Sequence, residues 1–166
     1  KTAMKLSGCP FESEDYLMAH LFELTGPFGE ISVLDNVIAA RTTSHVPIKD
    51  VSENLTEERI MKAIKHCAKT LKQMGIQDPA IGVAALNPHG GEEGTCGREE
   101  IEVIEPTIKK AQEQGIKAMG PYPGDTLFRR AFNGDFDGVV TMYHDQGQIA
   151  LKTAGFERGV TISGGM

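Results

Sequence analysis

The sequence predicts a three-layer α/β/α domain built on a mostly parallel β-sheet. Apolar runs of strand length alternate with amphipathic segments of helix length along the 166 residues, and 19 glycines and 8 prolines mark their boundaries. Parallel strands need crossover connections of helix length, so this alternation favours helices on both faces of the sheet. The chain is long enough for one domain with a substantial core, and we expect residues 1–166 to form a single unit.

The clearest helix is predicted for residues 56–75, with Thr56 as N-cap and Gly75 as C-terminal stop. The run 80–86 is apolar throughout, which is typical of a strand buried on both faces. The turn-forming pair at 35–36 predicts an antiparallel piece near the start of the sheet. In chain order, the other expected helices cover 12–24, 98–114, 125–132 and 146–154, and the other expected strands cover 31–34, 37–40, 116–119, 138–143 and 160–162.

Composition excludes several classes of protein. The chain is 40% hydrophobic and 24% charged, with a net charge of -6, which argues against a nucleic-acid-binding protein. No apolar run approaches the roughly 18 residues of a membrane span, and residues 1–5 do not resemble a signal peptide. Three cysteines without metal-type spacing predict reduced thiols and a cytoplasmic location, with Cys67 in the core. Both ends suggest a piece cut from a longer protein.

Three of the five histidines stand just behind predicted strands: His45, His89 and His144. The carboxyl ends of parallel strands share one edge, and ligands bind in the crevice outside that edge. Three imidazoles at this edge could converge on one divalent ion, because three protein ligands with open positions are typical of a catalytic metal site. The alternative is that each is a polar surface residue.

The other two histidines, His20 and His66, lie on predicted helices, and we expect both to be solvated or half-buried at the surface. The loop 87–97 contains four glycines and opens a helix, so its amides could cradle an anion; it could equally be a mobile connection. No dinucleotide fingerprint of the Gly-x-Gly-x-x-Gly type occurs, so a Rossmann cofactor site is not supported.

Four further polar residues are candidates for the same edge. Asp125 is either a helix N-cap or a carboxylate that accepts a proton. Asp145 is either a cap or a group that orients His144, and we place Asn87 beside His89 in a similar supporting role. Lys152 is either a solvated lysine or a contact for an anionic substrate.

Five short motifs surround these residues: Thr43-Ser44-His45-Val46-Pro47, then residues 86–92, 123–128, 142–147 and 155–160. Taken together, in this order and at this spacing, they resemble the 4-hydroxythreonine-4-phosphate dehydrogenase family of pyridoxal phosphate biosynthesis. The resemblance runs from about Leu24 to the C-terminus, whereas residues 1–23 match poorly.

The resemblance implies a fold like that of the isocitrate and isopropylmalate dehydrogenases, with two α/β/α domains and the active site between them. The chain would be the central metal-binding and dimerisation portion, without the second domain. It implies a homodimer whose metal site takes His45 and His89 from one subunit and His144 from the partner. The ion would be zinc, with magnesium, cobalt or manganese as alternatives. Asp125 matches the catalytic acid or base.

The reaction implied by the resemblance is oxidation of a metal-held hydroxyacid by NAD or NADP, followed by decarboxylation. Lys152 matches a lysine that contacts the small anionic substrate. Thr161 stands where the biosynthetic enzymes carry asparagine. An upstream His-Thr pair has no clear match near residues 8–20, and a later arginine would fall beyond the last residue.

These departures indicate a paralogue that acts on 4-phosphohydroxy-threonine, on a related four-carbon sugar acid phosphate, or on a cis-dihydrodiol carboxylate, with the chain inactive by itself. Two other readings stay open. The same histidines would suit a zinc hydrolase, which needs no nicotinamide cofactor. The segment could also be a dimerisation module without catalytic function.

Overall fold

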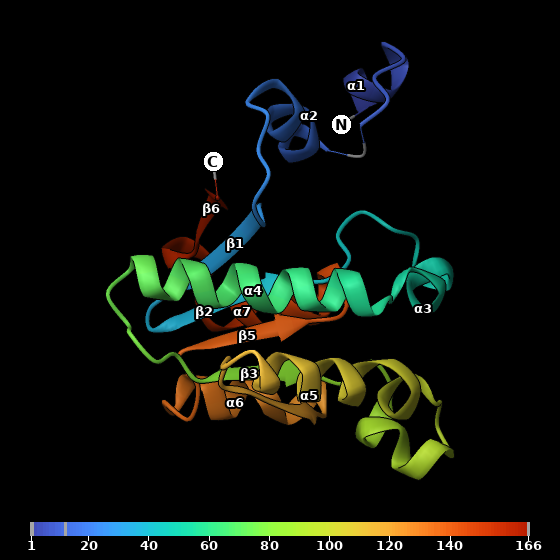
Figure 1. Ribbon diagram of the computed structural model, residues 1–166, viewed down its shortest axis with the longest axis vertical. Coiled ribbons are helices and arrows are strands. Elements are labelled where there is room, and N and C mark those ends of the chain that lie inside the picture. The colour runs from blue at the N-terminus through green and yellow to red at the C-terminus, as the bar shows by residue number, and fades with distance from the viewer. Residues whose placement is uncertain (1, 12, 166) are drawn as a thin grey trace.

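The computed structural model describes residues 2–11 and 13–165 and confirms a three-layer α/β/α arrangement (Figure 1). Its sheet has six strands in the order β4-β3-β5-β2-β1-β6. The strands are β1 (Gly29–Leu34), β2 (Val37–Arg41), β3 (Ile81–Ala84), β4 (Ala118–Tyr122), β5 (Gly138–Thr141) and β6 (Val160–Gly164). The helices are α1 (Thr2–Leu6), α2 (Glu14–Leu21), α3 (Val51–Asn54), α4 (Glu57–Gln73), α5 (Glu105–Glu113), α6 (Gly124–Phe132) and α7 (His144–Gly155). Short helical turns are η1 (Ile48–Asp50), η2 (Pro88–Gly94), η3 (Glu100–Ile104) and η4 (Phe156–Arg158).

The sheet is mostly parallel, as the sequence predicts. β4, β3, β5 and β2 run in the same direction, whereas β1 is antiparallel to both of its neighbours, β2 and β6. The predicted antiparallel piece is therefore the β1–β2 hairpin, joined by the turn at Asp35 and Asn36. Because β2 also pairs with β5, the carboxyl ends of four parallel strands share one edge.

Two apolar cores lie on opposite faces of the sheet. Figure 1 shows α4 crossing in front of the strands and α7 behind them. Alternate residues of β2 supply both cores: Ile38 packs with the α4 and α5 side, and Val37 packs with the α6 and α7 side. Strands buried on both faces must be apolar at nearly every position, which is why the run at 80–86 reads as a strand from sequence alone.

Most predicted boundaries agree with the structure, and the differences have local causes. Thr56 caps α4 by accepting a hydrogen bond from the Arg59 amide at 3.2 Å, as expected. The predicted helix 98–114 instead opens with the π-helical turn η3 before α5 begins. The predicted helix 12–24 is reduced to α2, whose N-cap Ser13 makes no side-chain capping bond; residue 12 lies outside the described residues. Among the described helices, none is long and apolar enough to cross a membrane.

The surface position expected for His66 is wrong, because the residue is only 4% exposed. Its Nε2–H donates to the carbonyl of Gly29 at 3.0 Å, and a Cβ on Gly164 would come within 2.7 Å of the ring. These two glycines belong to β1 and β6, far from α4 in sequence, so the periodicity of the helix does not reveal that these strands cover His66. Cys67 is buried as predicted, and burial raises the pKa of its thiol to about 12.

Burial of His66 predicts that the protein loses stability in mild acid. Burial lowers the pKa of His66 from its ordinary 6.5, while the bond to Gly29 opposes this shift. The unfolded chain then takes up a proton that the folded chain excludes. The free energy of unfolding should fall below about pH 6.5, by up to about 1.4 kcal/mol per pH unit, until the folded group also protonates.

Urea unfolding of the wild type and of His66→Gln at about pH 7.5 and about pH 5.5 measures this effect. Glutamine keeps an N–H donor for Gly29 but does not titrate, so its stability should depend less on pH. The exposed His20, changed to glutamine, is the matched control. An unchanged pH dependence in His66→Gln would show that another group is responsible.

Candidate active site

The three histidines predicted from the strand pattern follow three neighbouring strands of the sheet. His45, His89 and His144 come after β2, β3 and β5, which lie side by side in the order β3-β5-β2. All three strands run in the same direction, so the three histidines leave the sheet at its carboxyl edge. The fold thus places the candidate residues where α/β sheets bind ligands.

Within one chain, His45 and His144 form a pair. Their ring centroids lie 5.7 Å apart, although 99 positions separate them in the chain (144 − 45 = 99). The side chain of His144 is 36% exposed, and its Nδ1 lies 2.6 Å from a carboxylate oxygen of Asp145. The backbone N-cap of α7 is Tyr143, so Asp145 orients the imidazole rather than capping the helix.

His89 does not join this pair in the same chain. Across the described ranges 2–11 and 13–165, no three His, Cys, Asp or Glu side chains are grouped closely enough to hold a metal ion. His89 is exposed on η2, the yellow-green turn that projects beyond the edge of the sheet in Figure 1. The resemblance implied His45 with His89 from one subunit, whereas the structure sets His144 beside His45.

Asn87 supports the loop that carries His89 rather than the imidazole itself. Its side-chain amide donates to Glu99 at 2.7 Å and to Glu100 at 2.9 Å. Hydrogen bonds from Ser52 and then Asn87 lower the pKa of Glu99 against the opposing effect of burial. The amides of Leu86 and Asn87, at the start of this loop, both donate to the carboxylate of Glu100, whereas the anion cradle expected from the glycine-rich part of the loop stays a prediction.

Gln146 joins three elements at the same edge, a role that the sequence pattern did not reveal. Its amide N–H donates to the Ala85 carbonyl at 2.7 Å, and its oxygen accepts from the Met142 amide at 2.8 Å. A Cβ on Gly124 would lie 3.0 Å from its nitrogen, so α6 also packs closely here. Gln146 therefore fixes the ends of β3 and β5 relative to the start of α7.

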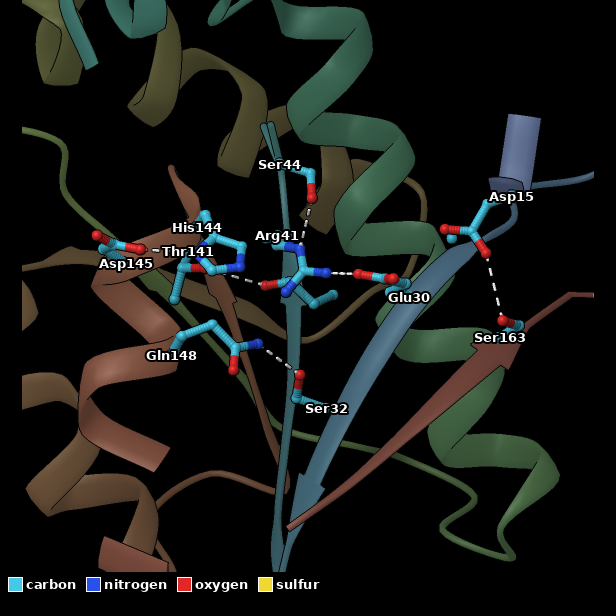
Figure 2. A network of polar contacts seen from close by, with 12 residues as sticks. Asp15, Glu30, Ser32, Arg41, Ser44, Thr141, His144, Asp145, Gln148 and Ser163 are labelled. Atoms are coloured by element: carbon cyan, nitrogen blue, oxygen red, sulfur yellow. Dashed lines mark hydrogen bonds and ion pairs between the residues drawn. The ribbon is translucent and has the colours of Figure 1, made fainter. Parts of the chain in front are cut away.

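Arg41 is a second residue that sequence reasoning missed. Figure 2 shows it at the centre of a polar network, paired with Glu30 and with its Nε donating to Ser44 at 3.1 Å. Arg41 and His144 line the same small hollow of about 10 Å³. Burial lowers the pKa of the guanidinium, and the Asp15 carboxylate opposes that shift. Arg41 can be recognised as a residue of the candidate site only once the structure shows that β2 ends beside the histidine pair.

Lys152 and Thr161 line one cavity of about 310 Å³ between α7 and β6. The ammonium of Lys152 lies 5.7 Å from the centre of the Phe156 ring, and both side chains are exposed. Ser32 and Gln148 line this cavity and also the hollow beside His144, and they are hydrogen-bonded at 2.9 Å. These two polar residues therefore border both the hollow beside His144 and the cavity of Lys152.

Asp125 lies in the first turn of α6, directly after β4, with an exposed side chain. The N-cap of α6 is Pro123 and no side-chain capping bond is made, so the purely structural reading of Asp125 as N-cap is wrong. Its position after a parallel strand puts this carboxylate at the same sheet edge as the histidines.

Comparison with known proteins gives a consistent result over the whole chain. Residues 1–166 match the family model described as "Pyridoxal phosphate biosynthetic protein PdxA". The chain is 47% identical over 169 residues to a Pseudomonas aeruginosa protein named "Putative 4-hydroxythreonine-4-phosphate dehydrogenase 2", covering 100% of this chain and 50% of that protein.

Two further comparisons agree with it. A Halalkalibacterium halodurans protein named "Putative D-threonate 4-phosphate dehydrogenase" is 37% identical, with 100% of this chain and 49% of that protein covered. The crystal structure of 4-hydroxythreonine-4-phosphate dehydrogenase from Klebsiella pneumoniae superimposes with a TM-score of 0.88 at 33% identity, covering 99% of this chain and 50% of that one. The chain therefore spans about half the length of the relatives it matches.

Proposed function

Because this chain belongs to the PdxA family, we propose that it is the metal-binding portion of a dehydrogenase that oxidises a phosphorylated hydroxyacid with NAD or NADP. One observation carries the proposal: the ring centroids of His45 and His144 lie 5.7 Å apart at the carboxyl edge of the sheet, and Ser32 and Gln148 border both the hollow beside His144 and the cavity of Lys152. The relatives named as dehydrogenases support the same reaction class.

The donor groups at this edge fit a divalent transition-metal ion. Imidazole nitrogens suit zinc and cobalt, and Asp145 holds Nδ1 of His144 so that Nε2 is the nitrogen left for binding. His45 and His144 would hold the ion together with His89. Since His89 is not grouped with the pair in one chain, we propose that a second copy of this chain supplies it and that the protein is a homodimer.

A bound divalent ion and NAD(P) would supply polarisation of the substrate alcohol and acceptance of its hydride. Asp125 would accept the hydroxyl proton, because its exposed carboxylate stands at the same edge. The alcohol thereby loses a hydride and a proton and becomes a ketone. A β-keto acid formed in this way would then lose its carboxylate as carbon dioxide, so the overall reaction would be an oxidative decarboxylation.

The charges around the site favour an anionic substrate of modest size. Lys152 would contact the phosphate, with Thr161 offering a hydroxyl from the opposite side of the same cavity. Arg41 also lies beside His144, where its charge is paired with that of Glu30. A four-carbon hydroxyacid phosphate, of the 4-phospho-D-threonate or 4-phosphohydroxy-threonine class, would present anionic groups at both ends. The similarity to the D-threonate relative supports this class.

We also propose a second domain for the whole protein and a location in the cell. A second α/β/α domain, arranged as in the isocitrate and isopropylmalate dehydrogenases, would supply the rest of the cofactor site. The free thiols of Cys9, Cys67 and Cys96 support a cytoplasmic location.

The proposal is tested in the longer two-domain protein proposed above, by following NADH or NADPH formation with 4-phospho-D-threonate, 4-phosphohydroxy-threonine and their unphosphorylated forms. We expect turnover of a phosphorylated acid, and a KM about ten- to a hundredfold higher in Lys152→Ala with a smaller change in kcat. Lys49, which is 81% exposed, gives the control Lys49→Ala. A cis-dihydrodiol carboxylate as the preferred substrate would replace the phosphate assignment. Ester hydrolysis without cofactor reduction would contradict the dehydrogenase.

A further inference from the structure

The turn that carries His89 has an unusual backbone. Residues 89–93 have φ values of 55, 69, 79, 44 and 54 degrees, and Gly94 has a φ of 93 degrees. Six consecutive residues in the left-handed region form a left-handed turn, although His89, Glu92 and Glu93 have side chains that disfavour it. Neighbouring contacts must therefore impose this conformation.

One buried carboxylate contacts the start of this turn. Glu100 is 1% exposed, and its Oε1 accepts hydrogen bonds from the amides of Leu86 and Asn87, both at 2.8 Å. Its Oε2 accepts from the side-chain amide of Asn87 at 2.9 Å. Three N–H donors on one buried carboxylate fix the exit of the chain from β3, just before Pro88 and His89.

The turn also closes around the same carboxylate. A Cβ on Gly91 would lie 2.6 Å from Glu100 Oε2 and 3.0 Å from the carbonyl of Gly97, so only glycine fits here. By contrast, a Cβ on Gly90 would meet no atom within 4 Å. Glu100 opens the π-helical turn η3, a distortion that often occurs at functional sites.

A second carboxylate ties this loop to the segment that follows His45. Glu99 accepts from Asn87 at 2.7 Å and from the hydroxyl of Ser52 at 2.5 Å. Ser52 belongs to α3, which comes a few residues after His45. Hydrogen bonds from Asn87 through Glu99 to Ser52 therefore link the loop of His89 to α3.

We propose that Glu100 is a positioning residue that holds the 89–94 turn left-handed and thereby fixes where His89 is presented. The inference rests on the proposed function, in which His89 completes a metal site with His45 and His144. Glu100 acts through the backbone and does not touch the ion. A residue needed only for packing would not require three hydrogen bonds to Leu86 and Asn87, which come just before Pro88 and His89.

The test is Co²⁺ titration of the protein, followed by the visible absorption bands that report the cobalt ligands. Glu100→Gln keeps the size of the side chain but sets one N–H against another donor, whichever way its amide turns. We expect Co²⁺ binding about ten- to a hundredfold weaker with altered bands. Glu102→Gln removes the same charge two residues away, from an exposed ion pair with Arg98, and should bind like the wild type.

A second pair of variants tests the turn without changing charge. Gly91→Ala and Gly90→Ala both place alanine at positive φ, but only the first would collide with Glu100. We expect Gly91→Ala to weaken Co²⁺ binding about tenfold more than Gly90→Ala. If Glu100→Gln does not fold, as judged by the absence of cooperative thermal unfolding, the comparison of Gly91→Ala with Gly90→Ala tests the role of Glu100 instead.

The outcomes separate the two proposals. If Glu100→Gln binds Co²⁺ as tightly as the wild type, or if Gly91→Ala and Gly90→Ala bind it equally well, the role of Glu100 is overturned and the proposed function is left intact. Failure of the wild-type dimer to bind Co²⁺ or Zn²⁺ overturns both. Weaker binding in a folded Glu100→Gln protein, with Glu102→Gln unaffected, establishes the positioning role.

Discussion

Replacement of His144 or His45 by alanine in the proposed two-domain protein should lower kcat/KM by about a thousandfold and remove the bound metal ion. The polarisation that a divalent ion gives to an alcohol is worth several kcal/mol in the transition state, which corresponds to a loss of this size. The two rings lie 5.7 Å apart, so either substitution leaves the other imidazole without its neighbour. Metal content by elemental analysis and turnover by cofactor absorbance measure the two effects together.

Two further variants serve as comparisons for this result. His20 is exposed, and its ring contacts Phe11 rather than the sheet edge, so His20→Ala should keep both metal and activity. Asp145→Asn keeps the shape of the group that orients His144 but removes its charge, and should weaken metal binding by about ten- to a hundredfold. Full activity in His144→Ala would show that the pair at the sheet edge is not catalytic.

Mixing two inactive variants should restore activity if the site is shared between subunits. His45 and His144 lie together in one chain, so each proposed site takes this pair from one copy and His89 from the other. A dimer of one His89→Ala chain and one His144→Ala chain would then contain one complete site and one doubly altered site. After mixing equal amounts and exchanging subunits, about half of the dimers are mixed, giving about a quarter of wild-type activity.

Other mixtures identify which histidines come from the same chain. His45→Ala mixed with His89→Ala should also recover about a quarter of the activity, whereas His45→Ala mixed with His144→Ala should recover none. The reverse pattern in these two mixtures would support the allocation implied by family resemblance, with His45 and His89 in one subunit. No recovery in any mixture would mean that the site is not shared. The unmixed variants serve as the controls.

Sequence patterns alone were sufficient to predict the layered fold and the candidate residues. Strands buried on both faces must be apolar throughout, and helix 56–75 needs an apolar face and a cap, so both features are local and visible in the chain. The histidines were found for the same reason, because strand ends are local features and carboxyl ends of parallel strands share an edge. Ordered motifs around them then indicated the family that the comparisons show.

Tertiary structure decided the features that depend on contacts between distant segments. The cover over His66 comes from β1 and β6, and no helix pattern records what packs against it. The strand order places β5 beside both β2 and β3, so it does not decide which histidine pairs with His144; only the folded chain sets the ring of His45 5.7 Å from the ring of His144, between centroids. Glu100 looks like an ordinary surface glutamate in the sequence, and only the π-helical turn places its carboxylate on the backbone before His89. Apolar periodicity reports which face of an element is buried, but hydrogen bonds between loops carry no periodic signal, so only the folded chain reveals them.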